Sequence, residues 1–125
     1  MTALIPILWN SDNSVPLDAR EAVESIKSSR RRYVLLIMDD VESPHSVGDL
    51  AEAIAAIEQD KEIPELTSQD RKRVYIALVQ HHLDKLDQLG AIADHERSKQ
   101  VYESEATEGL ADLVRHHESI CSNDE

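Results

Sequence analysis

Two helix-start signals in the middle of the chain constrain its fold more than any other feature. Ser46-Val-Gly-Asp49 and Thr67-Ser-Gln-Asp70 each place a hydroxyl at an N-cap and a carboxylate three residues later, which satisfies the free amides of a first helical turn. Apolar residues at helical spacing follow the first signal: Val47, Leu50, Ala51, Ile54 and Ile57. The second signal opens a run that ends at Gly90, a natural helix stop. We therefore predict two successive helices joined by a loop over Gln59–Leu66.

A predicted β-hairpin follows the second helix. Its strands are Ala91–Asp94 and Gln100–Ser104, and its turn is the polar segment His95–Lys99. Helix, helix, hairpin is the order of a winged helix-turn-helix, in which the second helix lies in the DNA major groove and the hairpin contacts the flanking backbone. The loop between the helices is longer than the roughly three or four residues of a strict helix-turn-helix. The predicted fold is mainly α with a small β-hairpin wing.

The predicted domain organisation has four parts: an N-terminal arm over residues 1–15, the winged-helix domain over 16–104, a C-terminal helix over 105–121 and a disordered tail over 122–125. The domain would begin with a helix over about Leu17–Lys27. A further helix, capped by Ser29, would run from Arg30 to Asp40, although its apolar run Val34–Met38 has no clear period and could equally be a buried strand. Asp84–Leu89 either continues the second central helix or forms a separate short one.

The C-terminal helix is predicted to begin with Thr107 as its cap and to run to about Glu118. One of its faces is apolar, with Leu110, Leu113 and Val114. We expect this face to form a homodimer contact. The alternative is that the helix packs back on its own domain.

The charge of the chain is unusual for a DNA-binding protein. Thirteen basic residues against twenty-five acidic ones give a net charge of −12 and a pI near 4.8, whereas attraction to phosphate normally supplies much of the affinity for DNA. Either the protein does not bind nucleic acid, or its acidity provides solubility in molar salt, where the Debye length falls to about 3 Å. The abundance of Asp and Glu, the scarcity of Lys and the absence of Phe favour the second interpretation.

A combination of short motifs resembles a family of small haloarchaeal proteins. The motifs are Arg30-Arg-Arg-Tyr-Val-Leu35, Leu50-Ala-Glu52, Arg71-Lys-Arg-Val-Tyr-Ile-Ala-Leu78, His82-Leu-Asp-Lys-Leu86 and Gly90. The resemblance covers about Leu17–Tyr102, and it implies an uncharacterised winged-helix domain that regulates transcription by binding DNA. A proline often stands in that family where this chain has Asp84, so the resemblance does not settle whether the helix breaks after Leu83.

The candidate DNA-binding residues come from the start of the second central helix, the wing and an earlier arginine cluster. Base-edge contacts are predicted for the exposed first turns, because Arg suits guanine and Gln suits adenine, and because Val74 and the residues after it are expected to face the core. Wing and cluster arginines and lysines would contact phosphate. The candidates are Thr67, Ser68, Gln69, Arg71, Lys72, Arg97, Lys99, Arg30 and Arg31. Each could instead be an ordinary solvated residue, and Arg73 could pair with Asp70.

Other chemistry is not indicated. The adjacent pairs His81-His82 and His116-His117 point about 100° apart on a helix and cannot easily share a metal ion. There is no Cys-x-x-Cys, nucleophile elbow or glycine-rich phosphate loop, so we predict no metal, no cofactor and no enzyme activity. A single cysteine, Cys121, fits a reducing cytoplasm, and no run is long enough to span a membrane.

Two functions remain open from the sequence. The first is a cytoplasmic regulator, dimeric through its last helix, that binds double-stranded DNA. The second is a protein–protein interaction module with the same fold that does not bind DNA. Basic residues gathered on one face around Thr67–Lys72 and Arg97–Lys99 would favour the first, and basic residues interleaved with Asp and Glu would favour the second.

Overall fold

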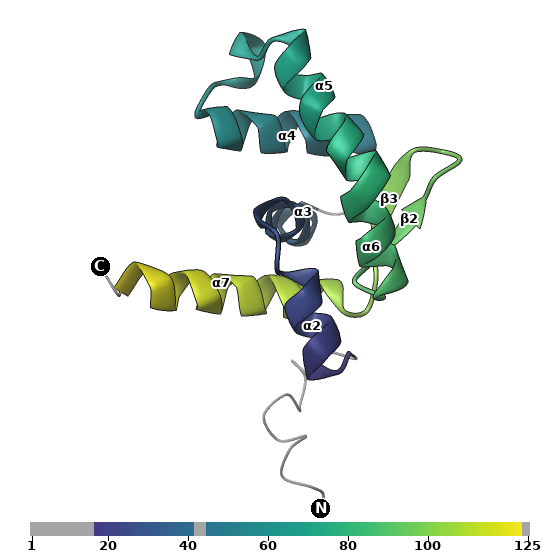
Figure 1. Cartoon of the computed structure of the whole chain (residues 1–125), viewed down its shortest axis with the longest axis vertical. Coiled ribbons are helices and arrows are strands. Elements are labelled where there is room, and N and C mark those ends of the chain that lie inside the picture. Colours follow the sequence, from purple (N-terminus) through teal and green to yellow (C-terminus); the bar gives the residue numbers. More distant parts are fainter. Residues whose placement is uncertain (1–16, 42–44, 124–125) are drawn as a thin grey trace, which may run out of the picture.

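The structure, a computed structural model, describes residues 17–41 and 45–123, and side chains only as far as Glu118. It is mainly helical with a small three-stranded antiparallel sheet (Figure 1). The elements in chain order are α2 (Ala19–Ser25), α3 (Ser29–Asp40), β1 (His45–Ser46), α4 (Val47–Gln59), the 3₁₀ turn η2 (Ile63–Glu65), α5 (Ser68–Ala77), the π-turn η3 (Leu78–His82), α6 (Leu83–Gln88), β2 (Ile92–His95), β3 (Gln100–Glu103) and α7 (Thr107–Asn123). The predicted N-terminal arm lies outside the described residues.

Both helix-start signals begin a helix, but only the one at Thr67 forms the complete predicted capping box. The hydroxyl of Ser46 accepts a hydrogen bond from the amide of Asp49 at 3.0 Å. The hydroxyl of Thr67 accepts from the amide of Asp70, and the carboxylate of Asp70 accepts from the amide of Thr67, both at 3.0 Å. The cap of α3 is Ser28 rather than Ser29.

The sheet contains a strand that the sequence patterns do not predict. β1 has only two residues and pairs antiparallel with β3, so that His45 lies opposite Val101, and the sheet order is β1-β3-β2. The amide of Val47 extends this pairing by donating to the carbonyl of Lys99 at 3.1 Å. The hairpin is thereby attached to the start of α4.

A single helical rod forms the second half of the central motif. α5, the π-turn η3 and α6 follow one another without a break (Figure 1), so Asp84–Leu89 is not a separate short helix. A π-turn contains one more residue per turn than an α-helix. Because of this extra residue, the buried positions Leu78 and Leu83 are five residues apart, whereas Val74 and Leu78 are four residues apart.

The prediction that Val74 and all later apolar residues of this helix face the core is wrong in part. Val74 and Leu78 are buried, but Ile76 and Val79 are 41% and 39% exposed. No other described element covers these two side chains fully.

The core is built around α3. Figure 1 shows this helix nearly end-on, between α4 and α7. Val34, Leu35 and Met38 are fully buried, which explains why the run has no amphipathic period. The helix prediction for this segment is confirmed and the strand alternative is wrong.

The C-terminal helix α7 packs back on its own domain. Leu110 and Val114 are fully buried, and α7 lies against α3. Arg115 fixes the contact by pairing with Asp39 at 2.9 Å and with Asp40 at 3.4 Å, two carboxylates at the end of α3 where the helix dipole disfavours negative charge. The face expected to form a dimer is therefore used inside the domain, and the homodimer stays a prediction. The helix also continues to Asn123, into the segment predicted to be a disordered tail.

Two hydroxyls join the end of the hairpin to the end of the rod. Thr107 is fully buried, and its hydroxyl donates to the carbonyl of Ala91 at 2.7 Å and accepts from the amide of Ser104 at 2.9 Å. The hydroxyl of Ser104 donates to the carbonyl of Gly90 at 2.7 Å and accepts from the amide of Ala106 at 3.1 Å. Four backbone groups in a tight crossing are satisfied by these two side chains.

His82 in the π-turn is expected to make the stability of the domain depend on pH. The Nδ1 atom of His82 is buried and has no hydrogen-bond partner among the described residues. Burial, followed by the positive charges of Arg31 and Arg30, lowers the pKa of His82 below its usual value. The folded protein therefore binds this proton less readily than the unfolded chain, so the contribution is favourable above the unfolded pKa of about 6.5 and is lost as the pH falls below it.

We expect the substitution His82→Gln to flatten the pH dependence of stability. Wild-type protein should lose free energy of unfolding between about pH 7 and pH 5, and the variant should lose less. Urea unfolding at several pH values measures both slopes. His116→Gln, which removes an exposed histidine of α7, should leave the wild-type slope unchanged. Equal slopes for wild type and His82→Gln would contradict the assignment.

Candidate nucleic-acid interface

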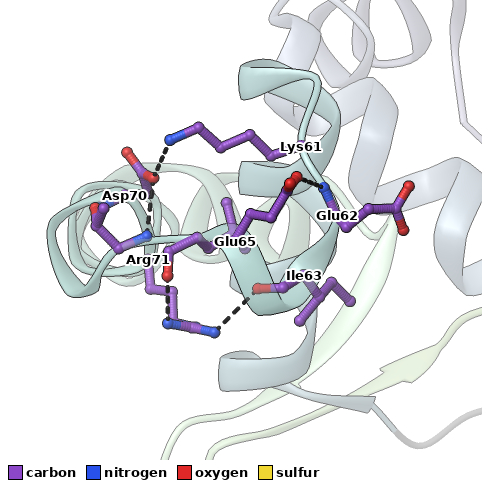
Figure 2. Close-up of polar contacts among 8 residues, drawn as sticks. Lys61, Glu62, Ile63, Glu65, Asp70 and Arg71 are labelled. Atoms are coloured by element: carbon purple, nitrogen blue, oxygen red, sulfur yellow. Dashed lines mark hydrogen bonds and ion pairs between the residues drawn. The ribbon is translucent and has the colours of Figure 1, made fainter.

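The side chain of Arg71 is committed to the loop between α4 and α5. Its Nε atom pairs with Glu52 of α4 at 3.0 Å. Its two terminal nitrogens donate to the carbonyls of Leu66 and Ile63 at 3.2 and 3.3 Å (Figure 2). The planar guanidinium suits this three-way contact. The donors of Arg71 thus stabilise the loop, and its predicted contact with base edges stays a prediction.

A second set of contacts orders the same loop. Lys61 pairs with Asp70 at 3.2 Å, and the amide of Glu62 donates to the carboxylate of Glu65 at 2.9 Å (Figure 2). The hydrogen bond from the Thr67 backbone, with a contribution from Lys61, lowers the pKa of the Asp70 carboxyl. Lys61, and not Arg73, is the partner of Asp70. The long loop predicted from the sequence is thus a fixed connection that sets the angle between α4 and α5.

We expect Arg71→Ala to destabilise the domain by about 1–3 kcal/mol, because two carbonyls lose a charged donor and the half-exposed pair with Glu52 contributes little more. Urea unfolding measures the change. Arg73→Ala, two residues further along α5 and without an ion pair among the described residues, is the matched control and should cost less than about 0.5 kcal/mol. Equal losses for the two variants would show that the loop contacts of Arg71 contribute nothing.

The arginine cluster before α4 is also internally paired. Arg30 makes two contacts with Glu58 of α4, at 2.6 and 2.9 Å. Arg31 donates to the carbonyl of Glu24 at 2.7 Å and lies 3.6 Å from its carboxylate. Both side chains join α3 to neighbouring helices, so the structure does not bring them to the exposed side of α5. Their predicted role as phosphate contacts has no support in this geometry.

The exposed side of α5 carries the remaining candidates. Gln69, Lys72, Arg73 and Ile76 are spaced three or four residues apart, so they share one face of the helix. Lys72 and Arg73 have no ion pair within residues 17–41 and 45–118. The sequence analysis leaves Arg73 open to a pair with Asp70 and places Ile76 in the core, so neither is among its predicted DNA-binding residues.

Thr67 and Ser68 stand at the start of this helix with exposed side chains. The hydroxyl of Thr67 is used as the cap of α5. The hydroxyl of Ser68 is not used in this way, and Ser68 lines the space between α4 and α5.

The wing carries Arg97 and Lys99 in an acidic setting. Both are exposed, and Lys99 has a left-handed backbone conformation with φ 58° at the end of the turn. Asp94 and Glu96 lie beside them on the hairpin. Burial, then the charges of Glu96 and of two α6 carboxylates, raises the pKa of the Asp94 carboxyl. The wing therefore presents two cations among several carboxylates.

An open groove separates the N-terminal half of α4 from α5. Its volume is about 530 Å³. The α4 wall is formed by Gly48, Asp49, Ala51 and Glu52. The α5 wall is formed by Ser68, Arg71, Lys72 and Tyr75.

Metal-binding clusters and membrane-spanning helices are both absent from the part of the chain that the structure describes. No group of three or more His, Cys, Asp or Glu side chains is placed to hold a metal ion within 17–41 and 45–118. None of the described helices is both long enough and apolar enough to cross a membrane.

Comparison with known proteins identifies a family but no characterised relative. Neither the curated proteins nor the solved structures give a significant match. A family profile with the description "Domain of unknown function (DUF7344)" matches residues 23–102. The match begins within α2 and ends within β3, so it contains α4, α5 and the hairpin. Because it spans most of the chain, the protein belongs to the DUF7344 family.

Proposed function

We propose that this protein is a winged helix-turn-helix regulator that binds double-stranded DNA. The observation that carries the proposal is the order α3, β1, α4, α5, β2, β3 with the sheet order β1-β3-β2. In winged-helix domains a short strand before the first helix of the helix-turn-helix, here α4, joins the hairpin in this way. This strand holds the wing beside the second helix of that motif, here α5, which is the helix that enters the major groove.

The proposed contacts differ from those expected from the sequence. Gln69, Lys72 and Arg73 on the exposed face of α5 would reach base edges and phosphates, and Ile76 would contact a thymine methyl group. Arg97 and Lys99 of the wing would contact the flanking backbone. Arg71 stabilises the loop before α5 through its hydrogen bonds to two loop carbonyls, and this loop helps to hold the exposed face of α5 in position.

The net charge of −12 fits a halophilic archaeal cytoplasm as the proposed setting. At molar salt the repulsion between the acidic domain and DNA is screened over about 3 Å. Affinity would then rest on base contacts and shape rather than on counterion release. As a homodimer, the protein would read two half-sites about one helical turn apart.

A specific observation also favours a second function, a protein-interaction module. The basic residues near the start of α5 and on the wing are interleaved with carboxylates: Arg71 with Glu52, Lys61 with Asp70, and Lys99 with Asp94 and Glu96. Such interleaving is the arrangement expected for a protein partner. The selection experiment described next distinguishes the two functions.

In vitro selection from a random duplex library tests DNA binding without requiring a defined operator sequence. We expect wild-type protein in molar KCl to enrich a defined motif, and Lys72→Glu/Arg73→Glu to enrich none, because two contacts reverse sign. Fluorescence anisotropy with the enriched duplex should show an affinity loss of at least about 100-fold, which corresponds to about 1.4 kcal/mol for each tenfold step.

The matched control reverses the same amount of charge elsewhere. Arg20→Glu/Lys27→Glu changes two exposed cations at α2, which lies at the opposite end of the molecule from α5 (Figure 1). This variant should retain the motif. If wild type enriches no motif, or if both double variants behave alike, the protein-interaction module replaces the DNA-binding proposal.

A further inference from the structure

The groove between α4 and α5 has oppositely charged walls. Asp49 and Glu52 stand on the α4 wall, and Arg71 and Lys72 stand on the α5 wall. Arg71 Nε lies 3.0 Å from the carboxylate of Glu52 across the groove, so these two charges neutralise each other. The other two charges do not close in this way, since neither Asp49 nor Lys72 has an ion pair or a side-chain hydrogen bond to another side chain within the described residues.

The surface between these two charges is largely apolar. Gly48 contributes from α4, and the half-buried ring of Tyr75 contributes from α5, while Ala51 lies beneath the groove in the core. The hydroxyls of Ser68 and Tyr75 are available beside it, since neither forms a hydrogen bond with another of the described residues. A volume of about 530 Å³ lies within the range of about 300–1,000 Å³ that is typical of small-molecule sites.

We propose that this groove binds a small zwitterion with an apolar body, of the class of free amino acids with aromatic side chains. The ammonium group would pair with Asp49 and the carboxylate with Lys72. The side chain would lie beside Gly48 and against the ring of Tyr75, where an aromatic pair adds to the apolar contact. The inference stands on the geometry of the groove and does not depend on DNA binding.

The chemistry explains why one molecule should carry both charges. An anion alone would meet the unpaired carboxylate of Asp49, and a cation alone would meet the ammonium of Lys72. A zwitterion satisfies both, and the fixed pair Glu52–Arg71 limits the groove at one side. Because the site is open to solvent, binding should be weak, with a dissociation constant on the order of 1 mM.

The test is a nuclear magnetic resonance titration of the full chain with L-phenylalanine as the probe. We expect saturable shifts at the amides of Ala51, Ser68 and Tyr75. 2-Phenylethylamine lacks the carboxylate and 3-phenylpropanoate lacks the ammonium group, so each should bind about tenfold more weakly, the effect of one lost charge-assisted contact. Asp49→Asn and Lys72→Gln should each weaken L-phenylalanine binding by a similar factor.

Two matched variants control for general effects of charge. Glu108→Gln removes an exposed carboxylate from the first turn of α7, as Asp49→Asn does in α4, and Arg73→Gln removes the cation next to Lys72 that does not line the groove. Both should bind L-phenylalanine like wild type. Absence of saturable shifts, equal binding of the three probes, or equal losses in the controls would overturn the proposal and leave the groove to a macromolecular partner.

Discussion

Replacing Leu78 by alanine is expected to destabilise the domain by about 2–5 kcal/mol, the range typical of fully buried leucines. Leu78 is 0% exposed and stands where α5 passes into the π-turn. Alanine favours the helix, so the loss measures the cavity and the lost apolar contacts. Urea unfolding gives the change in free energy, and a domain of this size could lose much of its stability.

Ile76→Ala is the matched comparison for Leu78→Ala. It removes a side chain of similar size from the same helix, but Ile76 is 41% exposed. We expect a loss below about 1 kcal/mol, since this side chain is removed from water only in part when the chain folds. Similar losses at the two positions would contradict this orientation of the helix.

Thr107→Val is the second substitution with a large expected effect, about 2–4 kcal/mol. Valine keeps the shape of threonine but leaves the carbonyl of Ala91 and the amide of Ser104 without their partner. Each buried group left unsatisfied costs about 1–3 kcal/mol. Thermal or urea unfolding measures the loss.

Thr107→Ser provides the control, because it keeps the hydroxyl and removes only a methyl group. It should cost about 1 kcal/mol. If serine is as harmful as valine, the methyl packing of Thr107 and not its two hydrogen bonds stabilises the junction between β3 and α7.

Local sequence signals predict most of the helices and the hairpin. Ser46 and Thr67 are identifiable as caps because capping depends on residues three positions apart. β1 escapes prediction because two residues carry no alternation, and it exists only through pairing with β3. The π-turn also escapes it, although the five-residue step from Leu78 to Leu83 is a visible sign of such a turn.

The candidate interface is harder to predict, because charge pairing depends on distant residues. Arg71, Arg30 and Arg31 have the right chemistry for DNA, but they are held by Glu52, Glu58 and Glu24, each of which lies on another helix. Asp70, which the sequence offers as one possible partner of Arg73, instead pairs with Lys61. The sequence indicates that α5 carries the candidate cations. Only the packed structure shows that Arg71 is paired within the domain, whereas Lys72 and Arg73 have no ion pair among the described residues.

The π-turn η3 changes the direction in which the side chains of α6 point around the rod axis, relative to those of α5. Loop contacts from α4 set the phase of α5, whereas the hairpin and the Thr107 junction set that of α6. In an uninterrupted α-helix these two requirements would have to agree at about 100° per residue. One additional residue in the turn shifts this agreement by a fixed rotation, so α6 buries Leu83 and Leu86 while Ile76 on α5 stays exposed.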